Sequence, residues 1–223
     1  MNARRAPAAV LLAGATGLIG GELIQQLLAL KPAPSLHALA RRVPEATDQR
    51  VHWQGVDFAK LPALPAADEA YCCLGTTIKQ AGSQAAFRAV DFDAVLAFAR
   101  AARIAGVTRF GVVSALGASV RSASFYNRVK GDMEAAVGAL GFDSLVVARP
   151  SLLAGDRVAL GQPQRTGEQL ALWITRPIAG LIPKGMRPIQ ARNVARSMVV
   201  ALRQPPQGMR IVESGELQAL AAA

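Results

Sequence analysis

Tyr126 and Lys130 stand four positions apart in the segment Tyr-Asn-Arg-Val-Lys, near the start of a stretch that we predict to be a helix. Residues at this spacing lie on one helical face, so the phenol and the ammonium can meet. A nearby positive charge favours the phenolate and lowers the pKa of a tyrosine from its usual value of about 10. The pair therefore indicates a general acid/base for carbonyl or alcohol chemistry, in which Tyr126 exchanges the proton. A packing or surface role on the helix is the alternative.

Ser114 is the third candidate catalytic residue. It ends the apolar segment 107–114, twelve residues before Tyr126. A hydroxyl at the end of a strand can donate a hydrogen bond to a substrate oxygen. The alternative is a turn or cap that leads into Gly117.

A glycine-rich loop lies between the apolar segment 10–13 and the helix-forming segment 22–30. A strand, a glycine loop and a helix in this order place a pyrophosphate on a helix N-terminus, where free N–H groups and the helix dipole favour an anion. We expect Gly14 to make the tight turn, Gly17 to let the phosphate approach, and Gly20 to pack the helix on the strand. The predicted cofactor-binding residues of this segment are Gly14, Thr16, Gly17, Leu18, Ile19 and Gly20.

Arg41 and Arg42 follow the second predicted strand, about twenty positions past the glycine loop. An acidic residue at this place binds the ribose 2′-hydroxyl of NAD, whereas arginine accommodates the 2′-phosphate of NADP. Guanidinium groups bind phosphate in a bidentate manner. The arginine pair therefore favours NADP(H) over NAD(H), with NAD(H) remaining possible. A solvated basic turn is the alternative.

Three other segments are expected to line the same crevice. Asp57 and Phe58, after the third strand, would lie near the adenine, or Asp57 would serve a turn. Gly75 and Thr76 follow the fourth strand, whose carboxyl end should face the ligand. Arg149 precedes a proline, so its backbone is extended and can pass the nicotinamide. An ion-pair role for Arg149 is equally open.

Strands and helices are predicted to alternate along the chain, which favours a parallel sheet with helices on both faces. We therefore predict a Rossmann-like, doubly wound α/β fold, in one domain with a cofactor-binding core at 1–150 and a small substrate-side extension at 151–223. The predicted strands are 8–13, 36–40, 51–55, 69–74, 107–114, 144–148 and 211–213, before an alanine-rich tail. The predicted helices are 18–30, 83–105, 123–140, 168–174 and 191–203, and residues 176–188 are predicted to form a basic connector.

Composition narrows the function classes. Hydrophobic residues make up 52% and charged residues 18% of the chain, as in globular proteins. The net charge of +10 attracts anions, but no basic run exceeds a pair and aromatic residues are only 5%, so there is no clear nucleic-acid signal. No segment has the uninterrupted apolar length of a membrane span. Adjacent Cys72 and Cys73 favour a reduced, cytoplasmic location, and His37 and His52 lack ligand spacing, so no metal is expected.

These segments together resemble the short-chain dehydrogenase/reductase superfamily, specifically its atypical, NAD(P)-binding branch, and are similar to the Tat-interacting-protein group and its bacterial relatives. The resemblance covers most of the chain. It implies that Tyr126 donates or accepts the proton, that Lys130 holds the nicotinamide ribose, and that Ser114 orients the reacting oxygen. The motifs that carry it are the glycine loop, Arg41-Arg42, Asp57-Phe58, Cys73-Leu74-Gly75-Thr76-Thr77, a later Val-Asp pair, Ser114, Tyr126/Lys130 and Arg149-Pro150-Ser151.

Three functions remain after this reading. The preferred one is an NADP(H)-dependent oxidoreductase acting on an unknown small carbonyl or alcohol, as a monomer or a homodimer. The second is an NADPH-binding sensor or interaction protein with little or no catalysis, since one fold serves both uses. The third is an epimerase- or dehydratase-like enzyme with tightly held NAD. The short segment 151–223 speaks against a full nucleotide-sugar pocket.

Overall fold

Seven parallel strands form one sheet in the order β3-β2-β1-β4-β5-β6-β9. The computed structural model describes residues 8–45, 47–154, 187–204 and 207–222. The chain runs from β1 outward to β3 and then returns to β4 on the other side of β1, which is the doubly wound order. The predicted fold class is therefore confirmed. The strands are β1 (Ala9–Ala13), β2 (Ser35–Ala40), β3 (Val51–Gly55), β4 (Glu69–Cys72), β5 (Arg109–Val113), β6 (Ser144–Arg149) and β9 (Gly208–Glu213).

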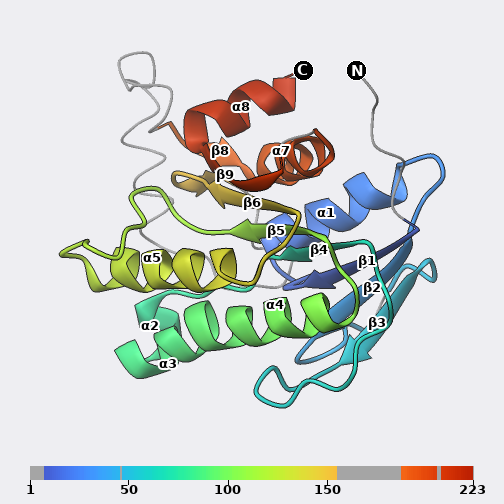
Figure 1. Cartoon of the computed structure of the whole chain (residues 1–223), viewed down its shortest axis with the longest axis horizontal. Coiled ribbons are helices and arrows are strands. Elements are labelled where there is room, and N and C mark those ends of the chain that lie inside the picture. Colours follow the sequence, from blue (N-terminus) through green and yellow to red (C-terminus); the bar gives the residue numbers. More distant parts are fainter. Residues whose placement is uncertain (1–7, 46, 155–186, 205–206, 223) are drawn as a thin grey trace.

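Helices cover both faces of the sheet (Figure 1). On one face, α1 (Leu18–Leu28) packs beside α7 (Ala191–Arg203), and on the other face lie α4 (Val95–Ile104) and α5 (Phe125–Gly138). Alternate residues of a strand point to opposite faces. Val10 and Leu12 of β1 accordingly join the core under α1 and α7, while Leu11 and Ala13 join the core under α4 and α5.

The predicted helix at 83–105 is interrupted by a wider turn. It consists of α3 (Gln84–Arg88), a π-helical segment η1 (Ala89–Ala94) and α4. A short helix that the sequence did not predict, α2 (Ile78–Ala81), precedes it and is capped by the Thr77 hydroxyl. A π turn holds one more residue than an α-helical turn. Asp91 lies in this segment and is completely buried.

The C-terminal part of the chain also builds the core. β9 pairs with β6 as the last strand of the sheet, and α7 packs on α1. A separate two-stranded sheet joins β7 (Leu153–Ala154) to β8 (Ile189–Gln190), and the predicted alanine-rich tail is a helix, α8 (Ser214–Ala222). The predicted helix 168–174 and residues 176–186 of the basic connector lie outside the described residues. Within the described ranges, none of the helices has the length and apolarity to span a bilayer.

Candidate active site

A cavity of about 780 Å³ opens at the carboxyl ends of the strands, around the place where β1 and β4 diverge. Ligands of α/β sheets bind at such a switch point, and the volume is typical of small-molecule sites. Most of the sequence-predicted site residues line this one cavity, although they come from seven separate segments. They are Gly14, Thr16, Gly17, Leu18, Ile19, Arg41, Asp57, Phe58, Leu74, Gly75, Thr76, Ser114, Tyr126, Lys130, Pro150 and Ser151.

The glycine loop has no room for side chains at two of its three glycines. Gly14 has a φ of +78°, and a Cβ there would lie 2.5 Å from the carbonyl carbon and oxygen of Cys73. A Cβ on Gly20 would lie 2.1 Å from the carbonyl oxygen of Gly14. Gly20 thus stands behind the loop and packs α1 on it, outside the cavity lining.

Gly17 caps α1 without any side-chain hydrogen bond to the first turn, which also contains no acidic residue. The first N–H groups of a helix have no partner within the helix, and the dipole there is positive. Gly17 and the first-turn residues Leu18 and Ile19 line the cavity. The loop is therefore shaped to receive an anion on its backbone.

The next two segments meet the cavity at the ends of β2 and β3. Arg41 lines it and is exposed, whereas Arg42 is exposed outside its lining. Asp57 lines the cavity and also makes a turn, because its Oδ1 accepts the N–H of Ala59 at 2.9 Å. Phe58 contributes to both the cavity wall and the core. The turn expected of Asp57 is thus observed, and its place beside an adenine stays a prediction.

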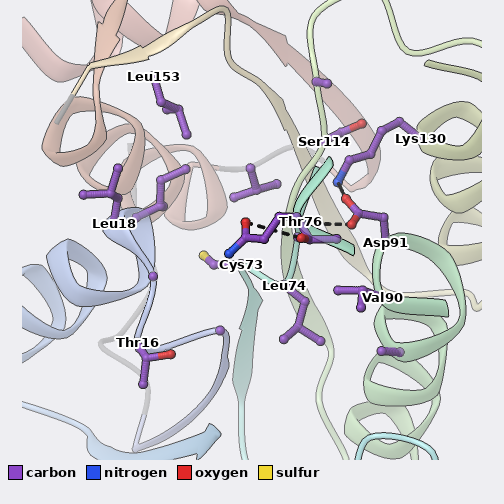
Figure 2. A pocket seen from close by; sticks show the side chains of 18 of the residues that line it. Thr16, Leu18, Cys73, Leu74, Thr76, Val90, Asp91, Ser114, Lys130 and Leu153 are labelled. Atoms are coloured by element: carbon purple, nitrogen blue, oxygen red, sulfur yellow. Dashed lines mark hydrogen bonds and ion pairs between the residues drawn. The ribbon is translucent and has the colours of Figure 1, made fainter. Parts of the chain in front are cut away.

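Lys130 is buried beside a carboxylate. Its Nζ lies 2.7 Å from Asp91 Oδ1, and both side chains are at most 3% exposed. The other carboxylate oxygen, Oδ2, accepts the N–H of Thr76 at 2.8 Å. Figure 2 shows Asp91 between Lys130 and Thr76, at the edge of the pocket. Burial disfavours the ammonium, but Asp91 and then Tyr126 favour it, and the pKa of Lys130 is raised above its usual value.

Tyr126 and Ser114 complete the polar side of the cavity. The Tyr126 ring packs on Phe87 of α3, with ring centroids 5.2 Å apart. Ser114 is 4% exposed, and its Oγ has no hydrogen-bond partner among the described residues. A buried hydroxyl without a partner costs about 1–3 kcal/mol, so Ser114 Oγ is available for a hydrogen bond to a water or a ligand. The structure brings the three predicted catalytic residues to one cavity.

Arg149 is not brought into the cavity lining. Its guanidinium pairs with Glu134 of α5, with Nε 2.9 Å from Oε1, and with Glu213 of β9, with Nη1 3.0 Å from Oε1. These hydrogen bonds, opposed by desolvation, raise the pKa of Arg149 further above its usual value. Of the two roles predicted for Arg149, the observed contacts are those of the ion pair.

The sequence reading missed two parts of the site. Asp91 received no role, although its Val-Asp pair was part of the family resemblance; burial of that aspartate is the signal that the sequence could not show. The second part is an apolar wall of residues outside the predicted set, of which Leu153 points into the pocket in Figure 2. The other apolar residues of this wall are Val113, Ala115, Leu116 and Leu152.

The residues present fit a phosphate-bearing dinucleotide. A backbone cradle at Gly14 and Gly17 suits a pyrophosphate, and Arg41 stands at the end of β2 with its charge exposed. At the other end of the cavity, the Ser114 hydroxyl, the Tyr126 phenol and the Lys130 ammonium suit a carbonyl or a hydroxyl. The arrangement can hold a nucleotide and exchange a proton with an oxygen beside it.

Comparison with known proteins identifies relatives over almost the whole chain, although no protein-family model matches it. The chain is 34% identical over 216 residues to Protein HTATIP2 of Rattus norvegicus, covering 92% of this chain and 86% of that protein. It is 31% identical over 222 residues to the protein named "Protein FMP52, mitochondrial" of Eremothecium gossypii, covering 94% of this chain and 96% of that protein.

Solved structures share the fold at lower identity. MoeE5 in complex with UDP-glucose and NAD superposes with a TM-score of 0.69 at 18% identity, over 96% of this chain and 81% of that one. A double mutant of DesIV, a dTDP-glucose 4,6-dehydratase from Streptomyces venezuelae with NAD and DAU bound, gives 0.68 at 17% identity, over 96% and 79%. At these identities the similarity shows the Rossmann-like fold.

The relatives correct one expectation. The cytoplasmic location expected from the cysteines is wrong as a simple assignment, because several FMP52 relatives are named mitochondrial. Cys72 and Cys73 are free thiols. The cytosol is not the only reducing compartment, so the thiols did not justify the narrower statement.

Proposed function

The chain belongs to the atypical short-chain dehydrogenase/reductase superfamily, and on this premise we propose that it is an NADP(H)-dependent oxidoreductase of a small carbonyl or alcohol. One observation carries the proposal: Ser114, Tyr126 and Lys130 line the same cavity as the glycine loop. When bound, the nicotinamide supplies or accepts a hydride. The protein then has to bind, orient and move one proton.

Each end of the cavity has its own task. The backbone of Gly14 and Gly17 would hold the pyrophosphate, and Arg41 would bind the 2′-phosphate that distinguishes NADP from NAD. The structural neighbours MoeE5 and DesIV are solved with NAD, which supports a nicotinamide dinucleotide in this fold. The preference for NADP(H) over NAD(H) rests on Arg41, because a guanidinium can donate two hydrogen bonds to one phosphate.

The catalytic end acts on the substrate oxygen. Ser114 Oγ–H would donate a hydrogen bond to that oxygen and fix its position, and Lys130 would hold the nicotinamide ribose. In the reduction of a carbonyl, Tyr126 gives its phenolic proton to the oxygen while the carbonyl carbon gains the hydride, so the product is the alcohol. Solvent then restores the proton to the phenolate. In the oxidation of an alcohol the proton moves the other way.

Two measurements test the proposal. The first is an intrinsic-fluorescence titration with NADPH and NADH, in which tighter binding of NADPH is expected. The second follows NADPH consumption with a panel of small aldehydes and ketones. Tyr126→Phe should lower turnover of any substrate found by at least about 100-fold and leave NADPH affinity nearly unchanged. Full activity of this variant would refute the role of Tyr126.

The panel also separates the two other functions. A sensor would bind NADPH, consume none with any carbonyl, and change its capture of a partner when NADPH is added. An epimerase would retain its nicotinamide through purification and show no net consumption. Either result would replace the oxidoreductase proposal.

A further inference from the structure

The apolar wall of the cavity has no task in the proposed reaction. Its residues are Val113, Ala115, Leu116, Leu152 and Leu153. They come from the end of β5 with the segment that follows it, and from the segment that follows β6. Small-molecule sites are lined mainly by apolar side chains, and a few polar groups fix the orientation of the ligand. The wall and the polar groups beside it therefore describe the ligand that fits them.

We infer that the substrate carries one polar oxygen on an uncharged, apolar body, and that this body lies on the apolar wall while the oxygen meets Ser114. The substrate class is thus an aliphatic or aromatic aldehyde, ketone or alcohol without phosphate, carboxylate or sugar hydroxyls. The inference rests on the proposed oxidoreductase function, since it names the substrate of that site.

The apolar wall adjoins Ser114. Both chain neighbours of this serine belong to the wall. The Ser114 N–H donates to the carbonyl of Ala148 at 2.7 Å, and the Leu116 N–H donates to the carbonyl of Pro150 at 3.0 Å. The two segments thus run side by side, and residues 150–153 continue the cavity lining from there. A carbonyl group that accepts from Ser114 Oγ would place its substituent among these side chains.

The side chains of the wall are open to a ligand. Leu116 lines the cavity and is 37% exposed, and Leu152 and Leu153 are partly exposed. Contact with an apolar group would remove this surface from water, which is favourable in proportion to the area covered. A hydroxyl or a charge in the same place would lose its water and gain no hydrogen bond from the wall.

Two other hydroxyls of the lining have already donated their protons. Ser151 Oγ donates to the carbonyl of Arg187 and accepts from Ser214 Oγ at 2.9 Å. Thr76 Oγ1 donates to Gln80 Oε1 at 3.4 Å. The buried Ser114 hydroxyl, by contrast, has no hydrogen-bond partner among the described residues. This part of the cavity thus suits a ligand with one oxygen, whereas each further hydroxyl of a sugar would be buried without a good partner.

The charges of the cavity lining do not face the wall unpaired. Among the described lining residues the charged ones are Arg41, Asp57, Asp91 and Lys130. Arg41 and Asp57 follow β2 and β3, and β1 and β4 lie between those strands and β5. Asp91 and Lys130 form an ion pair, and Arg149 outside the lining is bound by two glutamates. A carboxylate or phosphate on the wall would therefore have no counter-charge from the described lining.

The test uses primary amides, because an amide presents the same carbonyl oxygen as an aldehyde and resists reduction, so that binding is measured without turnover. Propanamide, butanamide, pentanamide and hexanamide form the apolar series. The monoamide of adipic acid ends a six-carbon chain in a carboxylate, and gluconamide carries hydroxyls on a six-carbon chain. Each is titrated by NMR into the protein with NADPH and into the free protein.

We expect each methylene of the apolar series to tighten binding by about fourfold, the value of one buried CH₂ group. The adipic monoamide and gluconamide should bind at least about tenfold more weakly than hexanamide. Ser114→Ala should weaken all four amides of the series by the same factor and leave the gain per methylene unchanged, because it removes only the contact with the oxygen.

Leu116→Asn replaces an apolar side chain of the wall by a polar one of similar size. It should weaken hexanamide by about tenfold and propanamide less, because only the longer chain extends over the wall. Val120→Asn is the matched control, since Val120 is an exposed apolar residue of the same segment outside the cavity lining. It should leave the whole series unchanged.

The inference is overturned if hexanamide binds no more tightly than propanamide, or if the adipic monoamide or gluconamide binds as tightly as hexanamide. Equal effects of Leu116→Asn and Val120→Asn would overturn the place given to the apolar body. The oxidoreductase proposal fails separately. An amide series that behaves as expected, together with no NADPH consumption by any carbonyl, would refute the redox reaction and keep the ligand class. Turnover of sugar aldehydes alone would do the reverse.

Discussion

Arg149 Nε lies 2.9 Å from Glu134 Oε1, and this contact joins the carboxyl end of β6 to the helix that carries Tyr126 and Lys130. A second contact, from Arg149 Nη1 to Glu213 Oε1, joins β6 to β9 at the edge of the sheet. The guanidinium thus holds α5 and two strands together beside the cavity, and its positive charge is taken up by protein carboxylates.

Replacing Arg149 by Met should lower the free energy of unfolding by about 3–5 kcal/mol, because Glu134 would be left buried and unpaired. Urea unfolding measures this change. The double variant Arg149→Met with Glu134→Leu removes both charges and should regain most of the loss. A large loss of NADPH affinity in Arg149→Met without loss of stability would instead make Arg149 a ligand contact.

Adjacent glycines of α1 should respond in opposite directions to alanine. In Gly20→Ala the Cβ would lie 2.1 Å from the Gly14 carbonyl oxygen, so the loop must move and unfolding should become easier by about 3 kcal/mol. NADPH binding should be lost with it. In Gly21→Ala the Cβ would meet no atom within 4 Å beyond its chain neighbours and the backbone of its own helix, and the helix should gain about 0.5–1 kcal/mol. Equal behaviour of the two variants in thermal unfolding would contradict the packing of the loop.

The two arginines after β2 should differ in their effect on the cofactor. Arg41 lines the cavity, so Arg41→Ala should weaken NADPH binding by about 10–100-fold, the value of charge-assisted hydrogen bonds, and leave NADH binding unchanged. Arg42→Ala is the matched control, since Arg42 is exposed outside the cavity lining. Isothermal titration of both variants with both nucleotides checks this. A loss of NADH affinity equal to that of NADPH would show that Arg41 does not read the 2′-phosphate.

A stacked histidine pair should make stability depend on pH. His37 of β2 and His52 of β3 have ring centroids 4.9 Å apart, and burial and then His52 lower the pKa of His37 below 6.5. At a pH between the lowered pKa of His37 in the folded state and its usual value of 6.5 in the unfolded state, the folded protein therefore binds fewer protons than the unfolded chain. The contribution of His37 is complete above about pH 6.5 and is lost as the pH falls through its folded pKa.

The measurement is the urea midpoint from about pH 5 to pH 8, where histidine titrates. His52→Gln removes the second cause and should flatten the dependence, and His37→Gln should flatten it further. If His52→Gln leaves the slope of the wild-type protein unchanged, the two imidazoles do not interact.

The strands and helices were readable from the sequence where the chain satisfies local rules. The segment 51–55 is β3 as predicted, and the helix at 191–203 has the predicted bounds. The parallel sheet with helices on both faces follows from the alternation of strands and helices. By contrast, α8 was read as a tail, because an alanine-rich segment gives little amphipathic contrast.

Interactions between distant residues were not readable. The π turn around Asp91 adds one residue to the helix. Apolar residues are buried both before it, at Phe87, and after it, at Phe98, so the apolar pattern of the sequence still predicts one continuous helix. In the same way, nothing local to Arg149 reveals that Glu134 and Glu213 will surround it. The sequence predicted which segments would meet at the cavity, and it could not predict which charges would neutralise one another there.

The positions of α7 and β9 late in the sequence determine when the core around the glycine loop can be completed during synthesis. The helix that presents the glycine loop is covered by α7, and β6 gains its outer neighbour only from β9, so both supports come from the last quarter of the chain. A nascent chain that ends near residue 150 would leave the apolar surface of α1 open to water. Completion of the first half of the fold is therefore not sufficient to support the nucleotide cradle, because α7 and β9 must be synthesised first.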